Sequence, residues 1–83
     1  MPRGWPPLTW REMVDCLKAL GFTYDRTESS HQVWVHIGRQ LTVPIDTNWN
    51  PASGPMVRHV VVDQARVSRE QFYRSTKATS KKI

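Results

Sequence analysis

The sequence predicts an α+β fold in two layers, in the order α-β-β-β-α, with the helices on one face of an antiparallel three-stranded sheet. Two amphipathic helical patterns flank three short segments in which apolar and polar residues alternate. Short turns with polar residues or glycine separate these segments, which is typical of a meander of neighbouring strands. Helices at both ends of such a meander pack on one face of the sheet. We expect the other face to remain open to a partner.

The chain has 83 residues, which is enough for one domain with one modest hydrophobic core. A single cysteine, Cys16, excludes an internal disulfide and with it a disulfide scaffold. The first residues, MPRGWPP, lack the apolar stretch of a signal peptide, and no segment approaches the length of a membrane-spanning helix. We therefore expect a cytoplasmic protein that does not associate with a membrane.

The formal net charge is +5, and eight of the twelve basic residues are arginine. Residues 1–40 hold five basic and four acidic residues, whereas residues 41–83 hold seven and three. An arginine-rich basic domain favours polyanions such as nucleic acids, because each phosphate contact releases counterions. The alternative is that part of the excess charge belongs to a solvated C-terminal segment, KATSKKI.

The first helix is predicted between Thr9 and Gly21. Residues 1–8 hold three prolines and a glycine, so we expect an extended lead-in before the helix. Thr9 and Glu12 fit a capping box, and Gly21 stands where a left-handed C-cap is needed. The apolar stripe of this helix consists of Trp10, Met13, Val14, Leu17 and Leu20.

Three strands are predicted next, over residues 22–27, 31–37 and 40–45. Alternation within each strand separates a core face from an open face. We expect the core face to hold Val33, Val35, Leu41, Val43 and Ile45. We expect the open face to hold Gln32, Trp34 and His36.

The second half begins with a loop over residues 46–55, and Pro55 can start a second helix. Residues 56–66 contain three consecutive valines, which favour a strand, but Val57, Val60, Val61 and Ala65 form a helical stripe, so we interpret the segment as a helix. Ser68 and Gln71 repeat the capping-box pattern and predict a short helix that turns Phe72 inward. Residues 75–83 lack apolar periodicity and are expected to be disordered, which leaves one domain over residues 9–74.

Several short motifs, taken together in this order and spacing, resemble one family. They are Leu20-Gly21-Phe22, Ser30-His31 followed by Trp34 and His36, Thr42-Val43-Pro44, Arg58 with Gln64-Ala65, and the segment 67–72. Over about residues 8–73 the chain resembles the HicA-type, or YcfA-like, mRNA interferase toxins of bacterial toxin–antitoxin systems. The resemblance implies a fold like that of double-stranded-RNA-binding domains, metal-independent cleavage of mRNA, and a HicB-type antitoxin as partner.

The resemblance also implies that His31 is catalytic, because the family's one catalytic histidine follows a Gly-Ser or Gly-Gly pair. RNA provides its own nucleophile, the 2′-hydroxyl, so the protein has to move protons and offset charge. Histidine suits the proton transfer because a pKa of about 6.5 leaves both of its forms populated near neutral pH. Ser29 and Ser30 can offer backbone amides and hydroxyls to phosphate oxygens. We expect neither metal nor cofactor, since no pair of histidines or carboxylates has convincing metal-ligand spacing.

Four further residues are predicted to contact RNA. Arg26, Arg39 and Arg58 are candidates for the cation that stabilises the phosphorane, and the sequence does not distinguish among them. Trp34 can stack a base if it lies on the open face. The alternative for Trp34 is packing against a neighbouring strand or an antitoxin.

The chain departs from the family's pattern close to His31. Ser29 stands where the family usually has glycine, Glu28 where a basic residue is common, and Arg66 where a glycine usually follows the second helix. A carboxylate beside the catalytic position weakens phosphate binding. The alternative function is therefore a catalytically inactive RNA-binding or protein-interaction module of the same fold.

The histidines also have less specific interpretations. His31 could be a surface histidine that bonds a backbone carbonyl, which is the more common role of a lone histidine. His36 is expected to be exposed near a turn, and His59 to be packed or half-exposed on the second helix.

Overall fold

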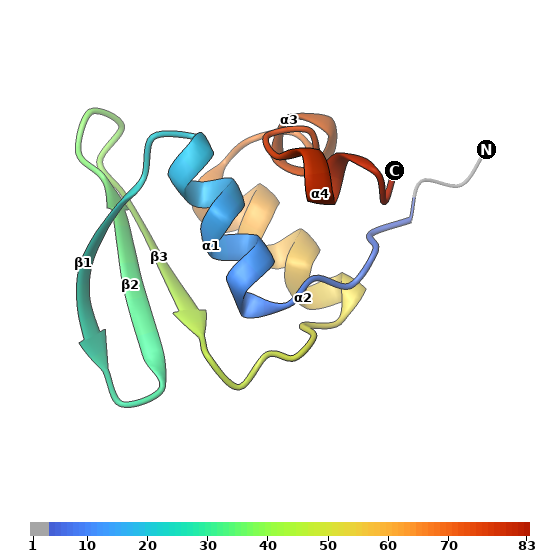
Figure 1. The fold of residues 1–83 in the computed structure, drawn as a ribbon. Coiled ribbons are helices and arrows are strands. Elements are labelled where there is room, and N and C mark those ends of the chain that lie inside the picture. Colours follow the sequence, from blue (N-terminus) through green and yellow to red (C-terminus); the bar gives the residue numbers. More distant parts are fainter. Residues whose placement is uncertain (1–3) are drawn as a thin grey trace.

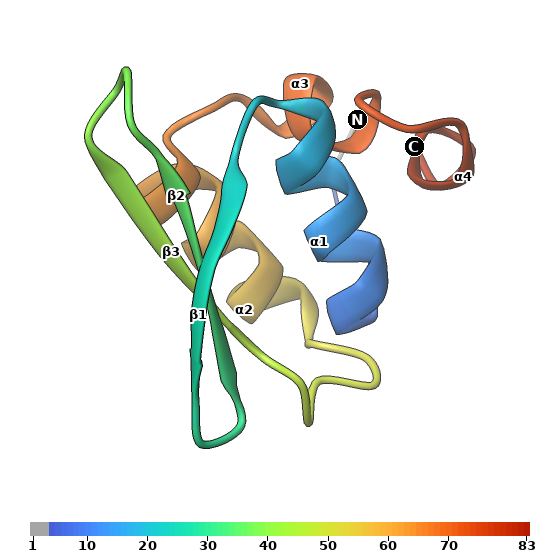
Figure 2. The same ribbon diagram turned by 60° about the vertical axis from the view of Figure 1, so that its left-hand side comes forward.

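The computed structural model describes residues 4–83 and confirms the α+β fold with a three-stranded antiparallel sheet. A helical layer covers one face of the sheet and leaves the other face open (Figures 1 and 2). In chain order the elements are α1 (Trp10–Ala19), β1 (Thr23–Glu28), β2 (His31–His36), β3 (Leu41–Asp46), α2 (Gly54–His59), the π-helix η1 (Val60–Ala65), α3 (Arg69–Tyr73) and α4 (Lys77–Ser80). No helix among residues 4–83 is long and apolar enough to cross a membrane.

Helix α1 begins and ends as its sequence predicts. The Glu12 backbone N–H donates to Thr9 Oγ1 over 3.2 Å, and the Thr9 N–H donates to Glu12 Oε1 over 2.9 Å, which completes the capping box. Gly21 ends the helical turn with a φ of 94°, a conformation that costs little only for glycine. Between these ends, the helix buries Met13, Val14, Cys16 and Leu17.

The strands form a meander in the order β1-β2-β3. Register pairs place Glu28 opposite His31 between β1 and β2, and His31 opposite Asp46 between β2 and β3. The β1–β2 register shifts between Tyr24 and Arg26, so that Asp25 is an irregularity in the edge strand. Every residue of β1 is exposed, which makes this strand a free edge of the sheet.

The predicted orientation of β2 is wrong. Trp34 lies opposite Val43 and belongs to the buried core, so its side chain faces the helical layer. Val33 and Val35 alternate with Trp34 and therefore face the open side, although Val33 is itself buried within that face. The strand has apolar residues on both faces, and the larger apolar surface of the tryptophan ring is the one placed against the helices.

Helix α2 and the π-helix η1 confirm the helical interpretation of residues 56–66. The Met56 N–H donates to Ser53 Oγ, which caps α2, and Pro55 lies in the first turn as expected. The stripe of Val57, Val60, Val61 and Ala65 is fully buried. The segment ends at Arg66, whose φ of 56° and ψ of 50° are left-handed, as is usual for the residue after a helix.

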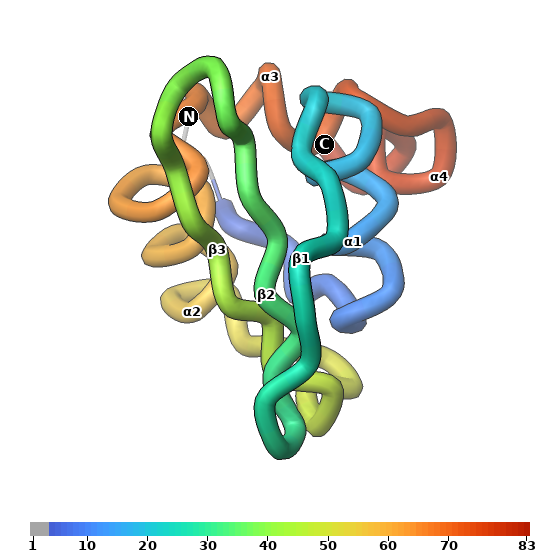
Figure 3. The backbone as a smooth tube through the Cα atoms, turned by 90° about the vertical axis from the view of Figure 1, so that its left-hand side faces the viewer, coloured from blue at the N-terminus to red at the C-terminus, as the bar shows by residue number. Residues whose placement is uncertain are grey.

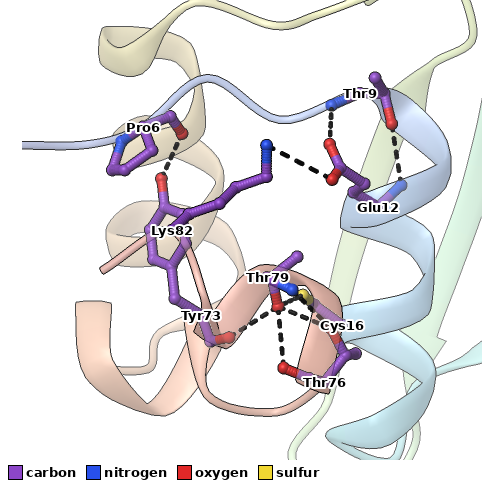
Figure 4. Close-up of polar contacts among 8 residues, drawn as sticks. All are labelled: Pro6, Thr9, Glu12, Cys16, Tyr73, Thr76, Thr79 and Lys82. Carbon is purple, nitrogen blue, oxygen red and sulfur yellow. Dashed lines mark hydrogen bonds and ion pairs between the residues drawn. The ribbon is translucent and has the colours of Figure 1, made fainter.

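The C-terminal residues are ordered in the structure, in contrast to the disorder expected from their composition. Helix α4 lies beside α1, and its Thr79 is buried (Figure 4). Thr79 Oγ1 donates to the Tyr73 carbonyl over 2.6 Å and lies 3.4 Å from Cys16 Sγ. Lys82 Nζ lies 3.5 Å from Glu12 Oε2. Polar contacts of this kind leave no apolar periodicity, which explains why the sequence pattern missed the helix.

The N-terminal residues are bonded to two other parts of the chain. Leu8 forms an antiparallel bridge with Ala52, and the Tyr73 hydroxyl donates to the Pro6 carbonyl over 2.6 Å (Figure 4). Trp5 and Trp49 are partly buried and pack against the core. The lead-in is thus bonded to the loop before α2 and to α3.

The buried phenol of Tyr73 gives the fold a defined response to alkaline pH. Burial raises the pKa of Tyr73 to about 12 from its ordinary value of 10.0. Because the folded state holds this proton more tightly, the phenol stabilises the fold below pH 10 and this contribution is lost as the pH rises from about 10 to about 12. We expect Tyr73→Phe to remove up to about 2 kcal/mol of pH-dependent stability in this range.

Chemical denaturation between pH 8 and pH 12 measures this effect. Burial also raises the pKa of the Cys16 thiol, which is present in both proteins and therefore serves as a shared background. Parallel stability profiles of the wild type and the variant would contradict the prediction.

Candidate functional site

His31 is the first residue of β2 and lies at the end of the sheet where β1 turns into β2. Figure 3 looks onto the open face of the sheet, with the β1–β2 turn at its lower end and the helices behind. His31 alternates with Trp34 along the strand, so its ring is on the open face, where 49% of its side chain is exposed. The imidazole is thus accessible to a large substrate and is attached to a regular strand.

Asp46 is the neighbour of His31 on β3. The two residues are register partners, and Asp46 Oδ2 lies 3.8 Å from His31 Nε2. The other carboxylate oxygen, Oδ1, accepts the Asn48 N–H over 2.9 Å, which fixes the orientation of the carboxylate. This separation allows an ion pair when the imidazole is protonated and is too long for a direct hydrogen bond. Asp46 can therefore attract the imidazole when it is protonated, but it makes no permanent hydrogen bond with the ring.

The turn before His31 is bonded to the loop that follows β3. The Ser30 carbonyl accepts two hydrogen bonds from Thr47, one from the N–H at 2.8 Å and one from Oγ1 at 3.0 Å. Ser29 has a φ of 55°, a left-handed conformation that glycine adopts far more readily than serine. The backbone at Ser29 thus has a conformation that suits glycine, although the residue there is serine.

Charged side chains of β1 lie on the other side of His31. Glu28 is the register partner of His31, and Arg26 Nε donates to Glu28 Oε2 over 3.1 Å. Arg26 also bonds Asp25, and these carboxylates raise the pKa of its guanidinium, Glu28 more than Asp25. Two carboxylates, those of Asp25 and Glu28, therefore pair with Arg26, and a third, that of Asp46, lies beside His31.

The other two arginines predicted to contact RNA lie elsewhere. Arg39 is in the β2–β3 turn, at the opposite end of the sheet from His31 (Figure 3). Its guanidinium donates to the Arg66 carbonyl over 3.0 Å and to the Ala65 carbonyl over 3.4 Å, so it caps the end of η1. Arg58 is exposed on α2, in the helical layer. The structure thus brings only Arg26 of the three candidates to the strand pair that contains His31.

Trp34 is not on the open face, where the sequence placed it. Only 5% of it is exposed, and the ring contacts Tyr24 edge-on at a centroid distance of 5.7 Å. Its indole Nε1 donates to Gln32 Oε1 over 3.2 Å. A base cannot stack on Trp34 from the side of His31.

The two remaining histidines occupy different environments. His36 is half-buried, in contrast to the exposure predicted for it: its ring packs edge-on against Phe22 at 5.3 Å, and its Nδ1 accepts the Arg39 N–H over 3.1 Å. His59 is exposed and forms an ion pair with Asp63, with Nδ1 2.8 Å from Oδ2. Neither histidine shares the face and the strand end of His31.

Asp46 is the residue of this site that the sequence did not reveal. The signal was present in the strand lengths, because a third strand that ends at Asp46 pairs that residue with the first residue of the second strand. The predicted third strand ended one residue earlier, at Ile45, which left Asp46 in the loop. Chemically, the site combines an exposed proton donor or acceptor, a carboxylate that orients it, and one nearby cation.

Comparison with known proteins gives one family. The sequence model described as the HicA toxin of bacterial toxin–antitoxin systems matches residues 10–50. The matched segment runs from α1 to the loop after β3, and it includes His31, Asp46 and the whole sheet. No curated protein and no solved structure matches the chain.

The positive φ of Ser29 predicts that glycine stabilises this turn. We expect Ser29→Gly to raise the free energy of unfolding by about 0.5–1 kcal/mol, because the strain of a left-handed serine exceeds the extra entropy of an unfolded glycine. Ser30→Gly is the matched control. Because Ser30 has no positive φ, this variant should lower the free energy of unfolding by about 0.5–1 kcal/mol. Denaturant unfolding of the two variants measures both effects, and equal changes in the two would contradict the prediction.

Proposed function

Because the family match over residues 10–50 assigns this chain to the HicA toxins of bacterial toxin–antitoxin systems, we propose that it is an endoribonuclease that cleaves mRNA through His31. The observation that carries the proposal is the exposed imidazole at the open end of the sheet, with a carboxylate fixed beside it. The mRNA would lie across the open face at the β1–β2 turn.

The proposed reaction uses the 2′-hydroxyl of RNA as nucleophile. Its oxygen attacks the adjacent phosphorus, the bond from phosphorus to the 5′-oxygen breaks, and the products end in a 2′,3′-cyclic phosphate and a 5′-hydroxyl. One proton leaves the 2′-hydroxyl and one reaches the departing 5′-oxygen, and His31 performs one of these transfers. Water completes the other transfer. A single histidine gives slow turnover, which suits a toxin.

The neighbours of His31 have separate roles in this proposal. Asp46, whose Oδ2 lies 3.8 Å from His31 Nε2, attracts the imidazole electrostatically once the ring has taken up a proton. Arg26 offsets the negative charge of the phosphorane, for which it must exchange its contact with Glu28 for one with the phosphate. Ser29 and Ser30 offer their backbone amides and hydroxyls to phosphate oxygens of the RNA. Groups of the chain together with water account for the steps, so we expect cleavage without metal or cofactor.

The assignment to a toxin–antitoxin system implies an antitoxin. We propose a HicB-type protein that inhibits the toxin in the cytoplasm by covering the open face around His31. This position would block access of RNA without any change in the fold of the toxin.

A second function is favoured by the carboxylates around His31. Asp25, Glu28 and Asp46 repel a phosphate, and Arg26 is already paired with two of them. A protein that had lost cleavage and kept RNA or antitoxin binding would tolerate this surface. The two functions differ in whether purified protein cuts RNA.

Cleavage of RNA by purified protein in excess EDTA tests the main proposal. We expect fragments with 2′,3′-cyclic phosphate ends, and a loss of at least about 100-fold in rate for His31→Ala, the typical contribution of general acid–base catalysis. His59→Ala is the matched control, because His59 is equally exposed and also faces a carboxylate. The absence of cleavage by the wild type would support the inactive module, and equal cleavage by wild type and His31→Ala would sink the role of His31.

The role of Asp46 has its own test. We expect Asp46→Asn to lower kcat by about tenfold and to leave KM unchanged or lower, because the amide no longer favours the imidazolium but no longer repels phosphate. A fall in kcat without a rise in KM is the result that a purely structural role would not give. Asp63→Asn, beside His59, is the control. A higher kcat for Asp46→Asn would mean that this carboxylate only opposes RNA binding.

A further inference from the structure

A groove runs between α1 and the free edge of the sheet, on the side opposite His31. Its volume is about 660 Å³. It falls within the size range of small-molecule sites. Its walls are α1 on one side and Tyr24, Gln32 and Trp34 of the sheet on the other.

The groove combines aromatic rings with cations. Trp34 lies deepest, Tyr24 stands edge-on against it, and Trp10 is half-buried in the opposite wall. A cation lies over each tryptophan: Arg11 Cζ is 5.2 Å from the centre of the Trp10 ring, and Lys18 Nζ is 5.5 Å from that of Trp34. A ligand with a flat ring and a negative charge matches both features, because the ring can stack where the cations now lie and the cations can move to its charge.

Gln32 adds a polar contact of fixed orientation. An indole N–H can only donate, so the bond from Trp34 Nε1 identifies the oxygen end of the Gln32 carboxamide. The NH₂ end is therefore the one available to a ligand, and it can donate to an acceptor on the edge of a base. Gln32 also follows His31 directly along β2, which places the groove and the catalytic imidazole on opposite faces of the same strand end.

The chemistry of the groove favours RNA over a protein partner. A nucleotide supplies both the planar ring and the anion in one unit, and stacking on aromatic side chains is the usual way in which proteins hold unpaired bases. The two cations outnumber the single carboxylate of Asp15 in the lining. The cations partly cover the apolar side chains of the groove, so less apolar surface is available for an apolar side chain of a protein partner.

We propose that this groove binds an unpaired base of the RNA a few nucleotides from the cleaved bond. This inference rests on the proposed function for its link to cleavage, but not for the binding itself. The RNA passes from the open face, around the exposed β1 edge, and inserts one base between Tyr24 and α1. Lys18 and Arg11 then contact the flanking phosphates. The toxin thereby selects single-stranded segments, because a paired base cannot enter the groove.

The test measures binding in the His31→Ala background, so that cleavage plays no part. The probes are a short single-stranded oligoadenylate with a fluorescent end, an abasic RNA of the same length, and a duplex of that length. We expect the oligoadenylate to bind more tightly than the other two. Tyr24→Ala should weaken oligoadenylate binding about tenfold, the usual loss for one stacked base, and leave the abasic RNA unaffected.

Two variants serve as controls. Ile37→Ala removes another exposed apolar side chain, in the β2–β3 turn and outside the groove lining, and should change nothing. Tyr24→Phe keeps the ring and should bind like the parent, which separates stacking from a folding defect. Equal binding of oligoadenylate and abasic RNA, a preference for the duplex, or Tyr24→Ala that weakens only antitoxin binding would overturn the inference. Failure of the wild type to cleave RNA would contradict the proposed function but not the inference that the groove binds a base.

Discussion

The packing of Trp34 against the helical layer determines which way every other side chain of β2 faces. Because side chains alternate along a strand, burial of this one ring places His31 on the open face together with Asp46. It also places Gln32 and Tyr24 on the helix side, where they line the groove beside α1. A shift of β2 by one residue would exchange these faces and separate the histidine from its carboxylate. The packing of Trp34 against the helical layer thus determines both the candidate site and the groove.

The electrostatics of the site oppose the charge of the chain as a whole. The chain has a formal net charge of +5, but the two strands beside His31 carry three carboxylates and one arginine. Seven of the twelve basic residues lie between residues 41 and 83, and none of these seven is in the sheet. In the proposed function, this distribution would attract RNA to the molecule as a whole and hold it only weakly at the site. It would then suit a slow enzyme in which Arg26 is the cation that contacts phosphate.

The departures from the family's glycines have a common structural meaning. Ser29 and Arg66 both have a left-handed φ, of 55° and 56°. The turn before His31 and the end of η1 thus have backbone conformations that suit glycine, although the residues there are serine and arginine. At Ser29 the bonds from Thr47 to the Ser30 carbonyl hold the turn, and at Arg66 the guanidinium of Arg39 holds the carbonyl. Long-range hydrogen bonds can therefore maintain a local conformation that the local residue disfavours.

The sequence alone determined the helices, their caps, the three strands and their meander, because each depends on residues within a few positions of one another. Thr9 with Glu12, Gly21, and the stripe from Val57 to Ala65 were all found by such local patterns. The tertiary structure decided the facing of β2, since HQVWVH has apolar residues on both faces and only packing selects between them. It also decided that Asp46 and Arg26 approach His31 while Arg39 caps η1, and that α4 docks through Thr79. These contacts join residues that are far apart in the chain, and their energies depend on how the whole structure packs. Local sequence patterns therefore do not reveal them.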